Sequence, residues 1–212
     1  MWGLILIHTS WVIDFDTYPD MYVCVSVSGK IFLRMLQLPR KNTNDADLVG
    51  PLRKYLQSQS SKGSGGMWSS IFGSGKDKGS TDPHEDALAQ FNDLRKRATS
   101  SSSSAAVVMK NLAKYFEQIS YAESKFPVGD TIRVKFLWSN AFSEKKNKRS
   151  LNTLSEEKIC ILFNMGSVHT ELALEADGDA LQEKARHFRL AAGIYAAARE
   201  FVAEEDMSKM SD

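Results

Sequence analysis

The sequence has little net charge, few cysteines and no long apolar run. These features argue against nucleic-acid binding, a disulfide and a membrane-spanning helix, respectively. The formal net charge of the 212 residues is +1, and a chain without a clustered basic face is not expected to have nucleic acid as its main partner. Its two cysteines, Cys24 and Cys160, lie far apart, and Cys160 falls in a strongly apolar stretch. That position favours a buried free thiol over a disulfide, and hence a reducing compartment. No stretch approaches the roughly 20 apolar residues that span a bilayer, so a soluble intracellular protein is expected.

The N-terminus also lacks the features of a secretory signal. A signal peptide begins with basic residues and continues with an unbroken apolar core, whereas no Lys or Arg precedes Lys30 and His8 interrupts the apolar run. Residues 23–27 alternate valine with smaller residues, as in a strand. We interpret residues 1–30 as an N-terminal extension of uncertain role, either an added edge strand or a misplaced start of the gene.

Motifs for catalysis, cofactors and metals are missing as well. GSGK at residues 73–76 resembles the end of a phosphate-binding loop, but Ser70 and Asp77 stand where that motif requires a glycine and a hydroxyl residue. His-Thr-Glu at residues 169–171 matches the start of a zinc-deaminase signature, yet no paired cysteines follow. Two ligands do not make a tetrahedral zinc site, and no G-x-S-x-G nucleophile motif occurs. We therefore expect no enzyme activity, no cofactor and no metal site.

Helical patterning is the strongest feature that the sequence does contain. In residues 156–175, apolar side chains occupy most of the helix circumference, which is typical of a central helix packed on both sides. After the break at Asp177-Gly178, residues 179–202 carry many small residues, which allow a neighbouring backbone to approach closely. The two segments predict a helical hairpin. The single apolar stripe of the second helix is expected to consist of Leu181, Ala185, Phe188, Ala192, Tyr195 and Val202.

Shorter elements are predicted before this hairpin. They are a strand in residues 32–43 ended by Pro39, a short helix over residues 47–57 interrupted early by Pro51, a helix opening with the capping sequence Asp82-Pro83-His84-Glu85, and a helix over residues 108–119. Apolar residues at every second position predict a further strand buried on one face: Ile132, Val134, Phe136 and Trp138. Helices therefore dominate, with a small β-sheet near the N-terminal end.

Two features could contact a membrane or a partner. Residues 58–81 form a flexible insertion rich in Gly, Ser and Lys, and the apolar island inside it includes Trp68, Ile71 and Phe72. An apolar centre with a basic rim is typical of a short interfacial anchor, although an insertion without a packing role explains the same pattern. The loop at residues 143–150 can attract anionic headgroups, or be a solvated hairpin tip; its basic residues are Lys145, Lys146, Lys148 and Arg149.

Several longer motifs occur in a fixed order along the chain. They are D-L-V-x-P-L-R-K-Y-L, F-N-D-L-R-K-R-A, L-A-K-Y-F-E-Q-I, A-E-S-K-F-P, V-K-F-L-W-S-N-A-F, E-K-I-C-I-L-F-N-M-G-S-V-H and H-F-R-L-A-A-G-I-Y. With these motifs the chain resembles the N-terminal half of a Bro-type domain, as in the ALIX-like endosomal sorting adaptors of the plant or algal type. The resemblance implies a mainly α, TPR-like helical scaffold with a small sheet. The partial domain would occupy residues 31–57 and 82–203, with a tail at 204–212.

The resemblance also implies a function. It suggests a non-enzymatic adaptor of the ESCRT pathway, cytoplasmic and endosome-associated, with peripheral contact to the endosomal membrane. The family binds the C-terminal helix of an ESCRT-III subunit in a groove supplied mostly by later helices, so this chain is expected to bind it only with those downstream helices. The polar edge of that groove would include Asp179, Gln182 and Arg186, spaced to share one helix face.

A generic TPR-like interaction module with a different client is the alternative function. It predicts a repeat period near about 34 residues, and no such repeat is visible before Glu156.

Overall fold

The computed structural model describes residues 37–61, 83–100, 103–142 and 148–211. The chain divides into two units, Met1–Gln37 and Leu38–Asp212, and the elements below belong to the second. The predicted N-terminal extension at residues 1–30, the first part of the strand predicted at 32–43 and most of the 58–81 insertion lie outside the described residues.

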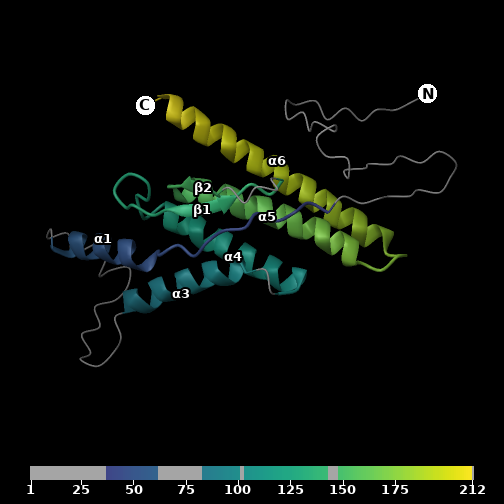
Figure 1. Cartoon of the computed structure of the whole chain (residues 1–212), viewed down its shortest axis with the longest axis horizontal. Helices are drawn as coiled ribbons and strands as arrows, with labels where there is room; N and C mark the ends of the chain where they lie inside the picture. Colours follow the sequence, from purple (N-terminus) through teal and green to yellow (C-terminus); the bar gives the residue numbers. More distant parts are fainter. Residues whose placement is uncertain (1–36, 62–82, 101–102, 143–147, 212) are drawn as a thin grey trace. The chain divides into compact units, whose positions relative to one another are not determined.

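The described chain is mainly α-helical, as predicted (Figure 1). Its elements are α1 (Val49–Ser61), α3 (Pro83–Ala98), α4 (Ala105–Glu123), β1 (Phe136–Ser139), β2 (Lys148–Leu151), α5 (Leu154–Glu175) and α6 (Leu181–Ser211). The strands β1 and β2 pair antiparallel, with Phe136 opposite Leu151. Both strands come from the middle of the sequence, and the N-terminal part that the structure describes adds only a single bridge between Thr43 and Trp138.

Helix α5 is the central helix of the fold, which confirms the prediction from its apolar circumference. Its start is set by a capping box: the Glu156 N–H donates to Thr153 Oγ1 at 3.1 Å, and the Thr153 N–H donates back to the Glu156 carboxylate. It packs against α4 on one side and α6 on the other (Figure 1). Its buried side chains, among them Ile161, Val168 and Ala173, therefore lie all around the helix.

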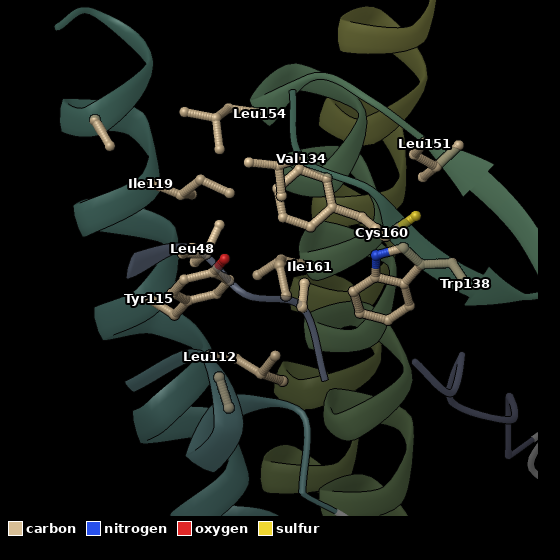
Figure 2. Packing of buried hydrophobic residues seen from close by; sticks show 14 of the residues in the cluster. Leu48, Leu112, Tyr115, Ile119, Val134, Trp138, Leu151, Leu154, Cys160 and Ile161 are labelled. Atoms are coloured by element: carbon tan, nitrogen blue, oxygen red, sulfur yellow. The ribbon is translucent and has the colours of Figure 1, made fainter. Parts of the chain in front are cut away.

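The core lies between α4, α5 and the sheet (Figure 2). Helix α4 buries residues spaced three or four apart, which is one face of a helix: Val108, Leu112, Tyr115 and Ile119. The alternation predicted near β1 is confirmed, because Ile132, Val134, Phe136 and Trp138 are buried while Arg133 and Lys135 are exposed. Cys160 is a buried free thiol, also as predicted.

Three predicted boundaries need correction. Helix α1 runs through Pro51 to Ser61 instead of being interrupted, because proline in the first turn lacks an N–H that would be unpaired there anyway. Residues 58–61 of the predicted insertion are therefore part of α1. Helix α6 continues to Ser211 and so includes most of the tail predicted at residues 204–212. Helix α3 begins at Pro83 as expected, while the predicted cap Asp82 lies outside the described residues.

Candidate partner-binding surface

Residues 38–41 lie along α5, and residues 42–44 lie beside β1, where the Ser139 N–H donates to the Asn42 carbonyl at 2.8 Å and the Asn44 N–H donates to the Leu137 carbonyl at 3.3 Å. Asn164, Ser167 and Thr170 follow one another at intervals of three on α5, and so share one face of the helix. The Lys41 N–H donates to Asn164 Oδ1 at 2.7 Å, and the Asn164 amide donates back to the Lys41 carbonyl at 3.0 Å. The hydroxyls of Ser167 and Thr170 bond two further backbone groups of the segment. Helix side chains thus satisfy backbone groups of residues 38–41 that a strand neighbour would otherwise pair. In the described part of the strand predicted at 32–43, pairing with β1 is limited to the bridge between Thr43 and Trp138.

A buried charged network joins this segment to the core. Glu157 is fully buried and accepts hydrogen bonds from Arg95 Nε at 2.8 Å, from Tyr115 at 3.4 Å and from the Trp138 indole N–H. Burial raises the pKa of Glu157, and the adjacent Arg95 guanidinium opposes that rise. Arg95 also donates to the Asn44 carbonyl at 3.0 Å. Because a buried charge is costly without partners, the network holds α3, α4, α5 and β1 in one arrangement.

This network was not among the predictions made from the sequence, although the sequence contains a signal for it. Leu88, Phe91, Arg95 and Ala98 follow helical spacing in α3, so Arg95 occupies an inward position of the apolar stripe. Glu157 likewise lies within the apolar α5. Two opposite charges at inward positions on separate helices indicate a buried ion pair.

The three predicted partner-binding residues lie in and just after the turn between α5 and α6; Figure 1 shows this turn at one end of the two helices. Asp179 is exposed in the turn before α6, and Gln182 and Arg186 are exposed on α6, one turn apart. Because α6 begins at Leu181, Asp179 does not share a helix face with the other two, and this part of the prediction is wrong. The structure nevertheless places all three on one short stretch of exposed chain.

The apolar stripe predicted for α6 is not its buried face. Its most buried residues are Ala191 and Ala198, whereas Ala185 and Ala192 are exposed and Leu181 is 64% exposed. Phe188, Tyr195 and Val202 of the predicted stripe are half-buried. Helix α6 therefore meets α5 along one side and leaves a second side open, where Leu181 lies with the small residues Ala185 and Ala192. Leu190, which is 39% exposed, is nine positions from Leu181 and lies on the opposite flank of the buried side.

A histidine pair connects α5 and α6 near the same end of the hairpin. The Nδ1 atoms of His169 and His187 are 3.0 Å apart, so one ring must donate to the other. Burial lowers the pKa of His169, and His187 and Arg186 lower it further. Glu183 lies 4.0 Å from His187 Nε2, one turn away on α6. His169 thus packs against His187 between the two helices.

The other predicted contact residues are spread over different parts of the chain. Trp68, Ile71, Phe72, Lys145 and Lys146 lie outside the described residues. Lys148 and Arg149 belong to strand β2 and not to a loop, and both side chains are exposed. The Lys148 ammonium also bonds the Asn44 side chain, which ties it to the segment before α1.

The described ranges contain no group of three or more His, Cys, Asp or Glu residues that could hold a metal ion. No helix within them is both long and apolar enough to cross a membrane.

Comparison with known proteins identifies relatives. A family model described as BRO1-like domain matches residues 35–212. The chain is 26% identical over 171 residues to ALG-2 interacting protein X of Dictyostelium discoideum, a match that covers 79% of the chain and 19% of the relative. It is also 26% identical over 165 residues to the vacuolar protein-sorting protein bro1 of Emericella nidulans, covering 76% of the chain and 15% of that protein. The chain thus spans less than a fifth of the length of these relatives.

The fold also matches a solved structure. The structure titled ALIX BRO1 CHMP4C complex is similar with a TM-score of 0.66 and 24% sequence identity. The match covers 80% of the chain and 46% of the solved chain. The resemblance noted from the ordered motifs is confirmed.

Proposed function

Because the chain belongs to the BRO1-like domain family, we propose that it is a non-enzymatic adaptor of endosomal sorting that receives a helix from an ESCRT-III subunit. The observation that carries the proposal is the match, over most of the described chain, to a BRO1 domain whose title names its complex with CHMP4C, an ESCRT-III subunit. One of its relatives is named for vacuolar protein sorting. The function would place the protein in the cytoplasm in association with endosomes.

The exposed side of α6 supports capture of a helix in a groove. In this mode an amphipathic helix lays its apolar face on a hydrophobic surface, and a few buried anchors supply most of the affinity. Leu181, Ala185 and Ala192 expose apolar surface along one side of α6. Asp179, Gln182 and Arg186 lie beside Leu181 in the chain and would set register and specificity, as rim charges do. The chain spans 46% of the solved domain, so we propose that the remaining half of such a domain supplies the other wall.

Titration calorimetry with a C-terminal ESCRT-III helix peptide tests the proposal. We expect weak or undetectable binding to residues 1–212 alone, and binding when the chain is joined to the second half of a BRO1-like domain from a relative. Asp179→Lys in the joined protein should weaken binding about tenfold, which corresponds to about 1.4 kcal/mol.

The matched control is Asp130→Lys, which reverses an exposed carboxylate near the opposite end of α5. Equal weakening by both variants would assign the effect to net charge and contradict the proposed rim. A joined, folded protein that does not bind the peptide would contradict the proposed function itself.

A further inference from the structure

One face of α4 carries lysines together with exposed apolar side chains. Val107, Lys110, Lys114, Gln118 and Tyr121 follow each other at intervals of three or four, so they lie along one side of the helix. Lys125 continues this line just beyond the end of α4, where its N–H bonds the Ala122 carbonyl at 3.0 Å. We name Val107, Lys110, Lys114, Tyr121 and Lys125 the outer face of α4. It is opposite the side that packs on the core (Figure 2).

The outer face is open to solvent and carries an excess of positive charge. Val107 is 48% exposed and Tyr121 is 54% exposed, so the face combines apolar surface with its lysines. Lys110, Lys114 and Lys125 are also exposed. The described part of the chain offers none of these lysines an ion pair, and Glu117 at the edge of the face is the one exposed carboxylate of α4.

Tyr121 and Lys125 already act together on this face. The Lys125 ammonium lies 5.6 Å from the centroid of the Tyr121 ring, a cation–π distance. An amphipathic ring beside a lysine is suited to the boundary between water and acyl chains, where the ring enters the interface and the ammonium reaches phosphate.

We infer that the outer face of α4 is a docking surface for an anionic lipid bilayer. Residues 107–123 extend over about 24 Å along the axis of α4 and Lys125 follows just beyond it. The three lysines therefore present a line of positive charge that a flat membrane can contact at once. A single exposed helix face is convex, whereas bound peptides require a groove or a sheet edge. The inference rests on the proposed function only because that function brings the chain to an endosomal membrane.

Co-sedimentation of the whole chain with vesicles tests the inference. Vesicles of two parts phosphatidylcholine to one part phosphatidylserine should bind the chain, and vesicles of phosphatidylcholine alone should not. Each lysine near an anionic surface strengthens binding by about fivefold, so replacing Lys110, Lys114 and Lys125 with alanine should weaken partitioning by about a hundredfold. Tyr121→Ser should weaken it further without changing the dependence on salt.

A matched triple variant separates this face from net charge. Lys54, Lys96 and Lys135 are exposed lysines on α1, on α3 and before β1, and their replacement by alanine removes the same charge. Partitioning that falls equally in both triple variants would overturn the inference, as would binding to neutral vesicles or preferential binding to soluble polyglutamate. Both triple variants change exposed side chains, so unchanged thermal unfolding should accompany the result. The vesicle assay contains no ESCRT-III peptide. Its result is therefore independent of whether the protein binds that peptide.

Discussion

Trp138 fills the core and also bonds a buried charge. The side chain is 2% exposed, and its indole N–H donates to Glu157. Trp138→Ala should lower the free energy of unfolding by about 3–5 kcal/mol through lost burial and an unfilled cavity. Trp138→Phe keeps much of the ring volume but leaves Glu157 with one donor fewer, and should cost about 1–3 kcal/mol. Urea unfolding measures both values.

The neighbouring residue Leu137 is the control, since it points away from Trp138 and is only half-buried. Leu137→Ala should cost less than Trp138→Ala. An unchanged urea midpoint in Trp138→Ala would mean that the inward face of the strand is assigned incorrectly.

The Cys160 thiol reports on opening of the core. Burial raises its pKa to about 12 from the ordinary 9.0, so it forms about a thousandfold less of the reactive thiolate than a free cysteine. In a Cys24→Ser variant, we expect Cys160 to react slowly with an aromatic disulfide reagent in buffer. The reaction should accelerate with urea in parallel with unfolding. Rapid reaction of the native protein would contradict the burial of this thiol.

At the scale of the elements, the contact between α5 and α6 depends on one glycine. A Cβ atom added at Gly166 would lie 2.6 Å from the Tyr195 ring, and the Tyr195 hydroxyl is held 3.1 Å from Ser167. Gly166→Ala should therefore force the helices apart and lower the free energy of unfolding by about 1–3 kcal/mol.

Gly193 on α6 is the matched control, because a Cβ there meets nothing within 4 Å. Gly193→Ala should raise the free energy of unfolding by about 0.4–1 kcal/mol, since alanine restricts the unfolded chain. Thermal or urea unfolding of the two variants gives the comparison. Equal effects of the same sign would show that the helices do not pack through Gly166.

The histidine pair should make the α5–α6 contact sensitive to acid. In the folded chain the pKa of His169 lies below its ordinary 6.5, through burial and then through His187 and Arg186. The unfolded chain therefore binds more protons below that value, so the stability contributed by neutral His169 is present above 6.5 and is lost as the pH falls through it. The melting temperature should fall between about pH 7.5 and about pH 5.5.

His169→Gln removes the titrating group and should flatten this change in melting temperature. Identical pH profiles for the two proteins would exclude His169 as the responsible group.

At the scale of the whole molecule, the exposed apolar residues of α6 should make the chain bind hydrophobic dyes and self-associate. Exposed apolar patches bind hydrophobic dyes, and helical repeats without a polar outer face associate. We expect the purified chain to increase the fluorescence of ANS and to self-associate in sedimentation velocity. Leu181→Gln combined with Leu190→Gln should reduce both signals without lowering stability, whereas Val107→Gln on α4 should leave the self-association unchanged. A monomeric protein that does not increase ANS fluorescence would contradict the prediction that α6 exposes an apolar surface.

For the helical hairpin of α5 and α6, some features could be predicted from the sequence and others could not. Its existence, its turn and the central position of α5 were predicted correctly from periodicity. The covered side of α6 was predicted incorrectly, because alanines occupy both sides of that helix and periodicity alone cannot rank two similar sides. The sequence also did not predict that α6 begins at Leu181. This start leaves Asp179 outside the helix that carries Gln182 and Arg186.

The sequence by itself determined the features that depend on neighbouring residues: the helix start at Pro83, the central α5, the alternating burial from Ile132 to Trp138 and the ordered motifs of the family. Each follows from local geometry, since helix and strand periods bring near neighbours to one face. Only the tertiary structure decided which distant groups meet. Arg95 and Glu157 are 62 positions apart, and their pairing depends on how α3 and α5 pack. The same packing leaves one side of α6 and the outer face of α4 open, because the partner of a face is chosen by the whole fold and not by the period of its residues.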